Sequence, residues 1–157
     1  MLLYLLRHGR AVPYGAASDE ERTLTPDGIT ALTTSLKSCR DRLPKPDRVV
    51  HSPYIRAHQS AKILGRVLEV EDRLVSLRSI TPEGDPNTFL ESLATAEPVN
   101  TMAVVSHEPF LGRLLALLLT GDRNGSIPMD VGMLAVVDLP STGSWLGHLR
   151  FAKTVDF

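Results

Sequence analysis

The sequence predicts an α/β fold, a three-layer sandwich in which a mostly parallel central sheet has helices on both faces. Short apolar runs typical of buried strands alternate with longer segments in which apolar residues recur every three or four positions, as in amphipathic helices. This alternation is typical of successive strand–helix units with parallel strands. The 157 residues suit a single domain spanning 1–157, and we find no repeat or linker within them.

The composition narrows the class of protein further. Hydrophobic residues make up 43% of the chain and charged residues 22%, which is ordinary for a globular domain. A formal net charge of -1 argues against a nucleic-acid or anionic membrane partner. No apolar run approaches the ~20 residues of a membrane span. Cys39 is the single cysteine, which excludes a disulfide framework. We therefore expect a cytoplasmic domain.

The first half of the chain contains two strand–helix units. The apolar residues 2–6 lead into Arg7-His8-Gly9, which indicates a buried strand ended by a glycine turn. Thr25-Pro26 starts a helix, with Thr25 as N-cap and Pro26 in the first turn. Residues 48–51 form a second strand, and Ser52-Pro53 caps the next helix. The two predicted apolar stripes are Ile29, Leu32, Leu36, Cys39 and Leu43 in the first helix, and Ala57, Ala61, Leu64 and Leu68 in the second.

The second half of the chain continues the alternation of strands and helices, but it ends in two strands without a helix between them. We predict strands at 74–79 and 101–106, a helix at 87–96, and an apolar core helix that runs from Pro109 to Thr120-Gly121. Residues 133–139 and 145–151 are predicted to be two final strands, joined by a Ser-Thr-Gly turn at 141–143. Such a short connection favours an antiparallel pair at the edge of the sheet.

Polar residues that could take part in binding or catalysis follow three of the predicted strands. Arg7-His8 follows the first, Arg56 lies just after the second, and His107 follows the strand at 101–106. The carboxyl ends of parallel strands meet at one edge of a sheet, so these side chains should converge there. Two guanidinium groups, two imidazoles and two helix N-termini form a site for a dianion such as phosphate. The histidines have no cysteine or carboxylate at metal-ligand spacing, so we expect neither a metal nor another cofactor.

A histidine among cations is well suited to covalent catalysis. The neighbouring arginines should lower its pKa and keep one ring nitrogen unprotonated near neutral pH. Phosphate could then pass first to the histidine and afterwards to water. A carboxylic acid is needed to protonate the leaving group and later to activate water. Asp19 and Glu83, which lie in predicted loops, are the first candidates, and either could instead be a solvated loop residue.

The same motifs resemble those of a known superfamily. Arg7-His8-Gly9, the run Ser-Pro-Tyr-Ile-Arg-Ala-x-Gln-Ser at 52–60 and Val-Ser-His at 105–107 are similar to the signature of histidine phosphatases, which include phosphoglycerate mutases. The short chain resembles the SixA-type phosphohistidine phosphatases in particular. So do the segments Arg-x-Leu-Thr-x-x-Gly at 22–28 and Thr-Pro-x-Gly-Asp at 81–85. The resemblance covers residues 2 to about 120 and implies a phosphoglycerate mutase-like fold.

The resemblance assigns roles to individual residues. It implies that His8 is the phosphorylated nucleophile and that Arg7, Arg56 and His107 form the phosphate pocket. We add two neighbours to the substrate-binding set, Gly9 and Glu108. Asp19 matches a loop carboxylate that is a proposed proton donor in SixA-type enzymes. Glu83 lies where mutase-like members place their general acid, so the choice between these two carboxylates stays open.

We therefore expect a metal-independent phosphatase that acts through a covalent phosphohistidine intermediate. The favoured substrate is phosphohistidine in a protein, such as a phosphotransfer domain or a phosphocarrier, because the insertions that cover the substrate in mutases are absent. One alternative is a phosphatase of a small phosphomonoester, either a sugar phosphate or a nucleotide. A second alternative is a non-catalytic phosphate-binding module.

Overall fold

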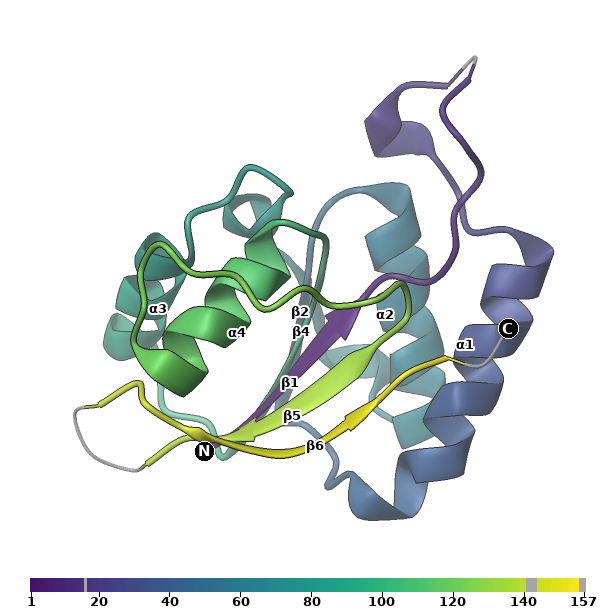
Figure 1. Ribbon diagram of the computed structural model, residues 1–157. Coiled ribbons are helices and arrows are strands. Elements are labelled where there is room, and N and C mark those ends of the chain that lie inside the picture. Colours follow the sequence, from purple (N-terminus) through teal and green to yellow (C-terminus); the bar gives the residue numbers. More distant parts are fainter. Residues whose placement is uncertain (16, 141–143, 156–157) are drawn as a thin grey trace.

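The computed structural model describes residues 1–15, 17–140 and 144–155. This part of the chain contains a six-stranded sheet with the strand order β3-β2-β4-β1-β5-β6 (Figure 1). The strands are β1 (Leu2–Arg7), β2 (Arg48–His51), β3 (Leu74–Ser76), β4 (Thr101–Ser106), β5 (Leu134–Asp138) and β6 (His148–Lys153). The helices are α1 (Pro26–Cys39), α2 (Ile55–Leu68), α3 (Pro86–Thr95) and α4 (Phe110–Thr120).

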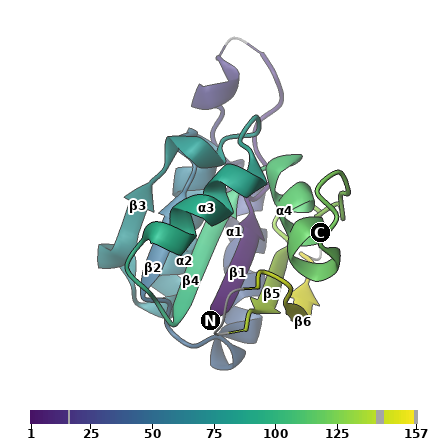
Figure 2. The same cartoon turned by 90° about the vertical axis from the view of Figure 1, so that its left-hand side faces the viewer.

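Different helices cover the two faces of the sheet. Helices α1 and α2 pack on one face, and α3 and α4 pack on the other (Figures 1 and 2). Side chains alternate between these faces along β1: Tyr4 and Leu6 join the core under α1 and α2, whereas Leu3 and Leu5 join the core under α3 and α4. The predicted three-layer α/β sandwich is confirmed.

The sheet is parallel on one side and antiparallel on the other. Strand β4 pairs in parallel with β1 and β2, and β2 pairs in parallel with β3. Strand β5 is antiparallel to both β1 and β6. The carboxyl ends of β1, β2 and β4 therefore lie together at one edge. The predicted antiparallel final pair is confirmed, and its predicted turn at 141–143 lies outside the described residues.

Helix α1 begins where its N-cap predicts, but one residue of its predicted buried stripe, Ile29, is exposed. The Thr25 Oγ1 atom accepts the Gly28 N–H at 3.0 Å. This cap orients Gly28 against the loop that follows β1, where an added Cβ would lie 2.3 Å from the Arg10 carbonyl oxygen. Because Gly28 takes the inward position, the next residue along the helix turns outward, and Ile29 is 40% exposed instead of belonging to the buried stripe.

Several element boundaries also differ from those predicted. The strand predicted at 74–79 ends at Ser76, because the chain leaves the sheet and forms a 3₁₀ helix that buries Ile80 in the core. The final strand starts at His148 instead of residue 145, and Trp145 packs against the core below α4. Helix α2 starts at Ile55 with no side-chain cap, so Ser52 is not its cap.

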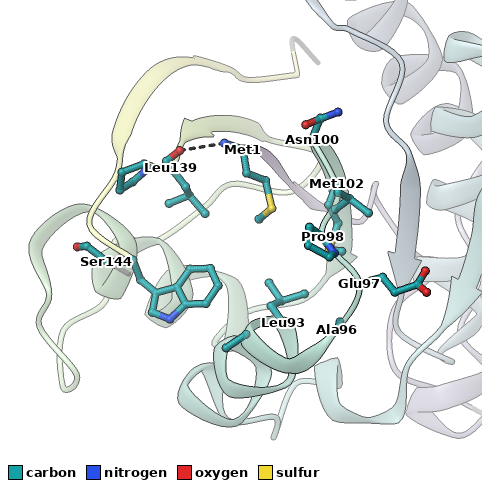
Figure 3. A pocket seen from close by; sticks show the side chains of 13 residues that line it. Met1, Leu93, Ala96, Glu97, Pro98, Asn100, Met102, Leu139 and Ser144 are labelled. Atoms are coloured by element: carbon teal, nitrogen blue, oxygen red, sulfur yellow. Dashed lines mark hydrogen bonds between the residues drawn. The ribbon is translucent and has the colours of Figure 1, made fainter. Parts of the chain in front are cut away.

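The opposite edge of the sheet contains an apolar cavity of about 530 Å³ (Figure 3). Its lining includes Met1 and Met102, at the amino ends of β1 and β4, together with Leu139 and Trp145. The cavity is therefore separated from the carboxyl ends of these strands by the length of the sheet. In the described part of the chain, no helix is both long and apolar enough to cross a membrane.

Candidate active site

Three strand–helix junctions meet at the carboxyl edge of the sheet. His8 follows β1, the segment 52–56 connects β2 to α2, and His107 follows β4. Backbone hydrogen bonds hold the junctions in register: the His8 N–H donates to the Ser106 carbonyl at 3.1 Å, and the Ser52 N–H donates to the Val105 carbonyl at 3.0 Å. The parallel topology thus brings together residues that lie about a hundred positions apart in the chain.

His8 is held in one tautomer by its neighbours. Its Nδ1 atom is 2.7 Å from the Gly9 carbonyl oxygen, which only accepts, so Nδ1 carries the proton. Its Nε2 atom is 3.2 Å from Arg56 Nε, which only donates, so Nε2 carries the lone pair. The imidazole therefore presents an unprotonated Nε2 beside a guanidinium group.

Burial keeps this imidazole neutral. Desolvation lowers the pKa of His8 from 6.5 to about 4, although the hydrogen bond to Gly9 opposes the shift. The positive charges of Arg56, Arg7 and Arg22 lower the pKa of His8 further. At neutral pH the Nε2 lone pair is consequently available as a nucleophile.

Arg56 connects His8 to Asp19. Arg56 is buried, and its Nη1 donates a short hydrogen bond to the Asp19 carbonyl oxygen. Its Nη2 lies 3.2 Å from the Asp19 Oδ2 atom, and Arg22 Nη1 lies 2.8 Å from Oδ1. Partial burial raises the pKa of Asp19, but the hydrogen bonds and charges of Arg22 and Arg56 outweigh it, so the pKa falls below its usual value. Asp19 is therefore an ionised carboxylate in contact with the arginine beside the candidate nucleophile.

His107 lies across the site from Arg56. Its ring centroid is 5.0 Å from that of His8 and 4.9 Å from that of Tyr54, whose own ring lies 5.1 Å from the Arg56 guanidinium carbon. The His107 Nε2 atom is 2.7 Å from Ser52 Oγ. Burial, followed by electrostatic interactions with His8 and Arg56, lowers the pKa of His107 to about 2. Its ring is neutral as well.

Arg7 and Glu108 are joined through the backbone of Met129. Arg7 Nη1 donates to the Met129 carbonyl at 2.7 Å, and the Met129 N–H donates to Glu108 Oε1 at 3.1 Å. Gly112 leaves room for this carboxylate, because an added Cβ would lie 2.6 Å from Glu108 Oε2. Burial raises the pKa of Glu108, although the Met129 N–H and the charge of Arg7 lower it. Glu108 thus orients the segment that holds Arg7.

Two buried nitrogen atoms in the site make no hydrogen bond within the described chain. They are the Nε atom of Arg7 and the Nδ1 atom of His107. Buried polar atoms are almost always paired in folded proteins, so unpaired ones call for an explanation. Beside the Arg56 guanidinium, these atoms fit a site that bonds the oxygens of a tetrahedral anion.

Three further polar residues in the site were assigned no functional role from the sequence. Ser60 Oγ accepts the Gly9 N–H at 3.0 Å, and Gln59 Oε1 accepts the Leu24 N–H at 2.7 Å. Both side chains lie on α2 in the motif that contains Arg56, so their spacing from Arg56 is a signal that could have found them. Ser52, predicted as a helix cap, instead contacts His107.

The two candidate acids differ in position. Asp19 contacts Arg56, whereas Glu83 is exposed in the loop before α3. Burial, and then the negative charges of Glu83, Glu20 and Asp19, raise the pKa of Tyr54. The charge of Glu83 therefore reaches the phenol group of Tyr54. Arg7, His8, Arg56, His107 and Asp19 are the predicted residues that the fold brings together most closely.

Known proteins are similar to this chain in sequence and in structure. No protein-family model matches the chain. The phosphohistidine phosphatase SixA of Escherichia coli strain K12 is 33% identical over 148 residues, which cover 92% of this chain and 89% of that protein. A SixA homolog of Haemophilus influenzae is 30% identical over 133 residues, covering 79% and 80% of the two chains. A structure of the protein histidine phosphatase SixA complexed with tungstate superposes with a TM-score of 0.84 at 28% identity, covering 98% of this chain and 97% of that one. The chain belongs to the SixA family of phosphohistidine phosphatases, within the phosphoglycerate mutase-like histidine phosphatases.

Proposed function

We propose that this SixA-family phosphatase removes phosphate from phosphohistidine in a protein, with His8 as the covalent nucleophile. The observation that carries the proposal is the neutral His8 ring, whose Nε2 lone pair lies 3.2 Å from Arg56 Nε. The E. coli relative is named for the same substrate class. Tungstate, found in the SixA complex, is a tetrahedral oxyanion like phosphate. This supports the use of the arginine cluster as a phosphate site.

In the first step, His8 Nε2 attacks phosphorus and the P–N bond of the substrate breaks. The phosphoryl group moves to His8, and the leaving imidazole takes up a proton from solvent or from a carboxylic acid at the rim of the site. Arg56, Arg7 and the unpaired Nδ1 of His107 bind the equatorial oxygens, where charge accumulates in the transition state. Ser52 Oγ accepts the Tyr54 N–H at 3.3 Å and can donate its hydroxyl proton to His107 Nε2, and in that arrangement Nδ1 of His107 carries the ring proton.

In the second step, water attacks the phosphorylated His8 and releases inorganic phosphate. Asp19 is the favoured proton acceptor, because it is ionised and contacts Arg56 beside the nucleophile. Glu83 is the alternative carboxyl group for both proton transfers, to the leaving group in the first step and from water in the second. The same two steps would hydrolyse a phosphomonoester, with an alcohol as the leaving group.

The surroundings of the site support a protein substrate over a small phosphomonoester. The apolar cavity of about 530 Å³ lies at the opposite edge of the sheet, and the candidate site is bordered by exposed loop residues such as Glu20 and Glu83. A phosphorylated side chain presented by a protein surface can reach such an open rim. A cytoplasmic location belongs to the same proposal, and the buried free thiol of Cys39 suits a reducing compartment.

A paired assay tests the proposal. The purified protein is given a histidine-phosphorylated phosphotransfer domain, free phosphohistidine and a panel of sugar phosphates and nucleotides, without added metal. We expect the highest kcat/KM on the phosphorylated domain. Efficient turnover of one small phosphomonoester instead would show that the substrate class is wrong.

The variant His8→Ala provides the mechanistic control. It should lose turnover and the acid-labile phosphate that rapid quenching traps on the wild-type chain. Comparable activity in this variant would rule out His8 as the nucleophile. No turnover and no trapped phosphate in the wild type would favour the phosphate-binding module.

A further inference from the structure

The loop that contains Asp19 also places an exposed carboxylate, Glu20, beside the phosphate pocket. Glu20 follows directly after Asp19, whose carbonyl oxygen and carboxylate both accept hydrogen bonds from Arg56. Because these bonds fix the backbone at Asp19, they also hold the next residue close to the pocket. The proposed reaction does not use Glu20.

The loop before β5 places a second exposed carboxylate beside the other arginine of the pocket. Asp130 follows directly after Met129, whose carbonyl oxygen accepts a hydrogen bond from Arg7 Nη1 at 2.7 Å. Two residues further along, the Gly132 N–H donates to the His8 carbonyl at 2.9 Å. These two bonds hold Asp130 next to the pocket, and its negative charge acts on Arg7.

The loop before α3 contains the third exposed carboxylate, Glu83. This loop is held by Ile80, whose carbonyl oxygen accepts a hydrogen bond of 2.5 Å from the hydroxyl of Ser106 at the end of β4. The charges of Glu83 and Glu20 both reach the phenol group of Tyr54. Two loops that are far apart in the sequence therefore act on the same ring at the start of α2.

We call Glu20, Glu83 and Asp130 the acidic rim. In the described part of the chain, none of the three is in an ion pair. The pocket that they border is prepared for an anion, because His107 is 1% exposed and its Nδ1 atom has no hydrogen-bond partner among the described residues. A free phosphate dianion is attracted by the pocket but repelled by the rim. A phosphoryl group that is flanked by cations is attracted by both.

We propose that the acidic rim binds lysine or arginine side chains that flank the phosphohistidine of a partner protein. Tyr54 and Ile55, which is 38% exposed, lie beside the pocket and offer apolar contacts to the same partner. Protein interfaces commonly combine such a centre with a polar rim. The inference rests on the proposed function and deepens it, since it specifies the charge of the partner surface.

Binding measurements test the proposal without depending on turnover. A phosphotransfer domain with basic residues beside its phosphohistidine is titrated calorimetrically into the His8→Ala chain. Adding Glu20→Gln and Asp130→Asn should weaken binding about fourfold or more, since each exposed ion pair changes affinity by roughly twofold to fivefold. The control pair Asp41→Asn and Glu97→Gln removes the same charge at exposed positions away from the site and should leave affinity unchanged. Unchanged binding in the rim variant, or equal weakening by the control pair, would overturn the proposal.

Kinetic assays should give opposite signs for the two classes of ligand. With His8 intact, Glu20→Gln/Asp130→Asn should lower kcat/KM on the basic phosphorylated domain and tighten inhibition by vanadate, because the rim no longer repels a small anion. Glu83 stays in place because it is a candidate proton donor. A domain whose flanking lysines and arginines are replaced by glutamine should be hydrolysed equally well by the rim variant and the wild type.

An equal loss of kcat/KM on both domains would overturn the proposal, as would weaker vanadate inhibition in the rim variant. A chain that binds the basic domain through the rim but releases no phosphate from it would support the surface and contradict the proposed function alone.

Discussion

At the scale of single residues, Arg56 has bonding partners on two sides. Its Nε faces His8, while Nη1 and Nη2 are bonded to Asp19. A phosphate group that binds the Nη edge therefore competes with the Asp19 carboxylate. We expect Asp19 to act in this way as an internal anion that balances the charge of Arg56 until a substrate binds.

This competition predicts the effect of Asp19→Asn. Removing the carboxylate charge should tighten competitive inhibition by vanadate roughly twofold to fivefold, the range of a single partly exposed ion pair. Turnover should fall at the same time, because the proposed proton acceptor is lost. Inhibition constants and kcat measured side by side check both effects. Asp41→Asn, at an exposed position, is the control. Weaker vanadate inhibition in Asp19→Asn would contradict the competition.

The protonation of His8 and His107 gives a second prediction at this scale. Because burial lowers their pKa values to about 4 and about 2, both rings should stay neutral as the pH falls from 8 to 5. Their imidazole resonances in an NMR titration should not shift over this range, and the same residues in the urea-unfolded chain should titrate near pH 6.5. A midpoint near 6.5 for His8 in the folded protein would show that its environment is not desolvated.

At the scale of elements, helix α1 supports the loop that follows the Arg7-His8-Gly9 turn. The Thr25 N–H donates to the Arg10 carbonyl at 2.9 Å, and Gly28 packs directly against the same carbonyl group. The first turn of α1 and the end of β1 therefore position each other. The glycine at this point is required by close approach, since a Cβ would overlap the Arg10 oxygen.

Gly28→Ala is accordingly expected to destabilise the protein. At an exposed helix position, alanine normally stabilises the helix by about 1 kcal/mol relative to glycine. Here the clash with the Arg10 carbonyl should reverse this effect and lower the free energy of unfolding by about 1–3 kcal/mol. Urea unfolding measures this loss, and kcat/KM should fall as the loop shifts. Gly15→Ala, where the nearest atom to an added Cβ is 3.9 Å away, is the matched control. A variant at position 28 as stable as the wild type would contradict the close packing.

The element types were predictable from sequence, whereas several contacts were not. Apolar runs and helical stripes identified each strand and helix, and parallel topology was enough to place His8, Arg56 and His107 at one edge. The contact between Asp19 and Arg56 depends on how the loop after β1 folds back, which is fixed by long-range bonds such as Arg22 Nε to the Val12 carbonyl. The spacing of residues along the sequence does not reveal such bonds. The role of Ser52 was missed for the same reason.

At the scale of the whole molecule, the site combines burial with charge. The sheet edge brings two arginines and two imidazoles into a desolvated cluster, so the folded chain keeps His8 and His107 unprotonated. The unfolded chain imposes no such restriction, because its histidines are hydrated and titrate near pH 6.5. The burial and positive charge that keep these two rings neutral therefore make the stability of the entire domain depend on pH.

The free energy of unfolding should fall as the pH is lowered from 7 to 5. Between pH 6.5 and about 4, the unfolded chain binds protons at these two histidines and the folded chain does not, so unfolding is favoured; above pH 6.5 neither state binds them and the effect vanishes. His8 alone should account for about 2 kcal/mol of the loss at pH 5, and His107 adds to it in the same direction. Urea unfolding of the wild type and of the double variant His8→Gln/His107→Gln at both pH values measures the difference. The double variant should show a flatter dependence on pH, and parallel curves for the two proteins would refute the assignment of this dependence to the buried imidazoles.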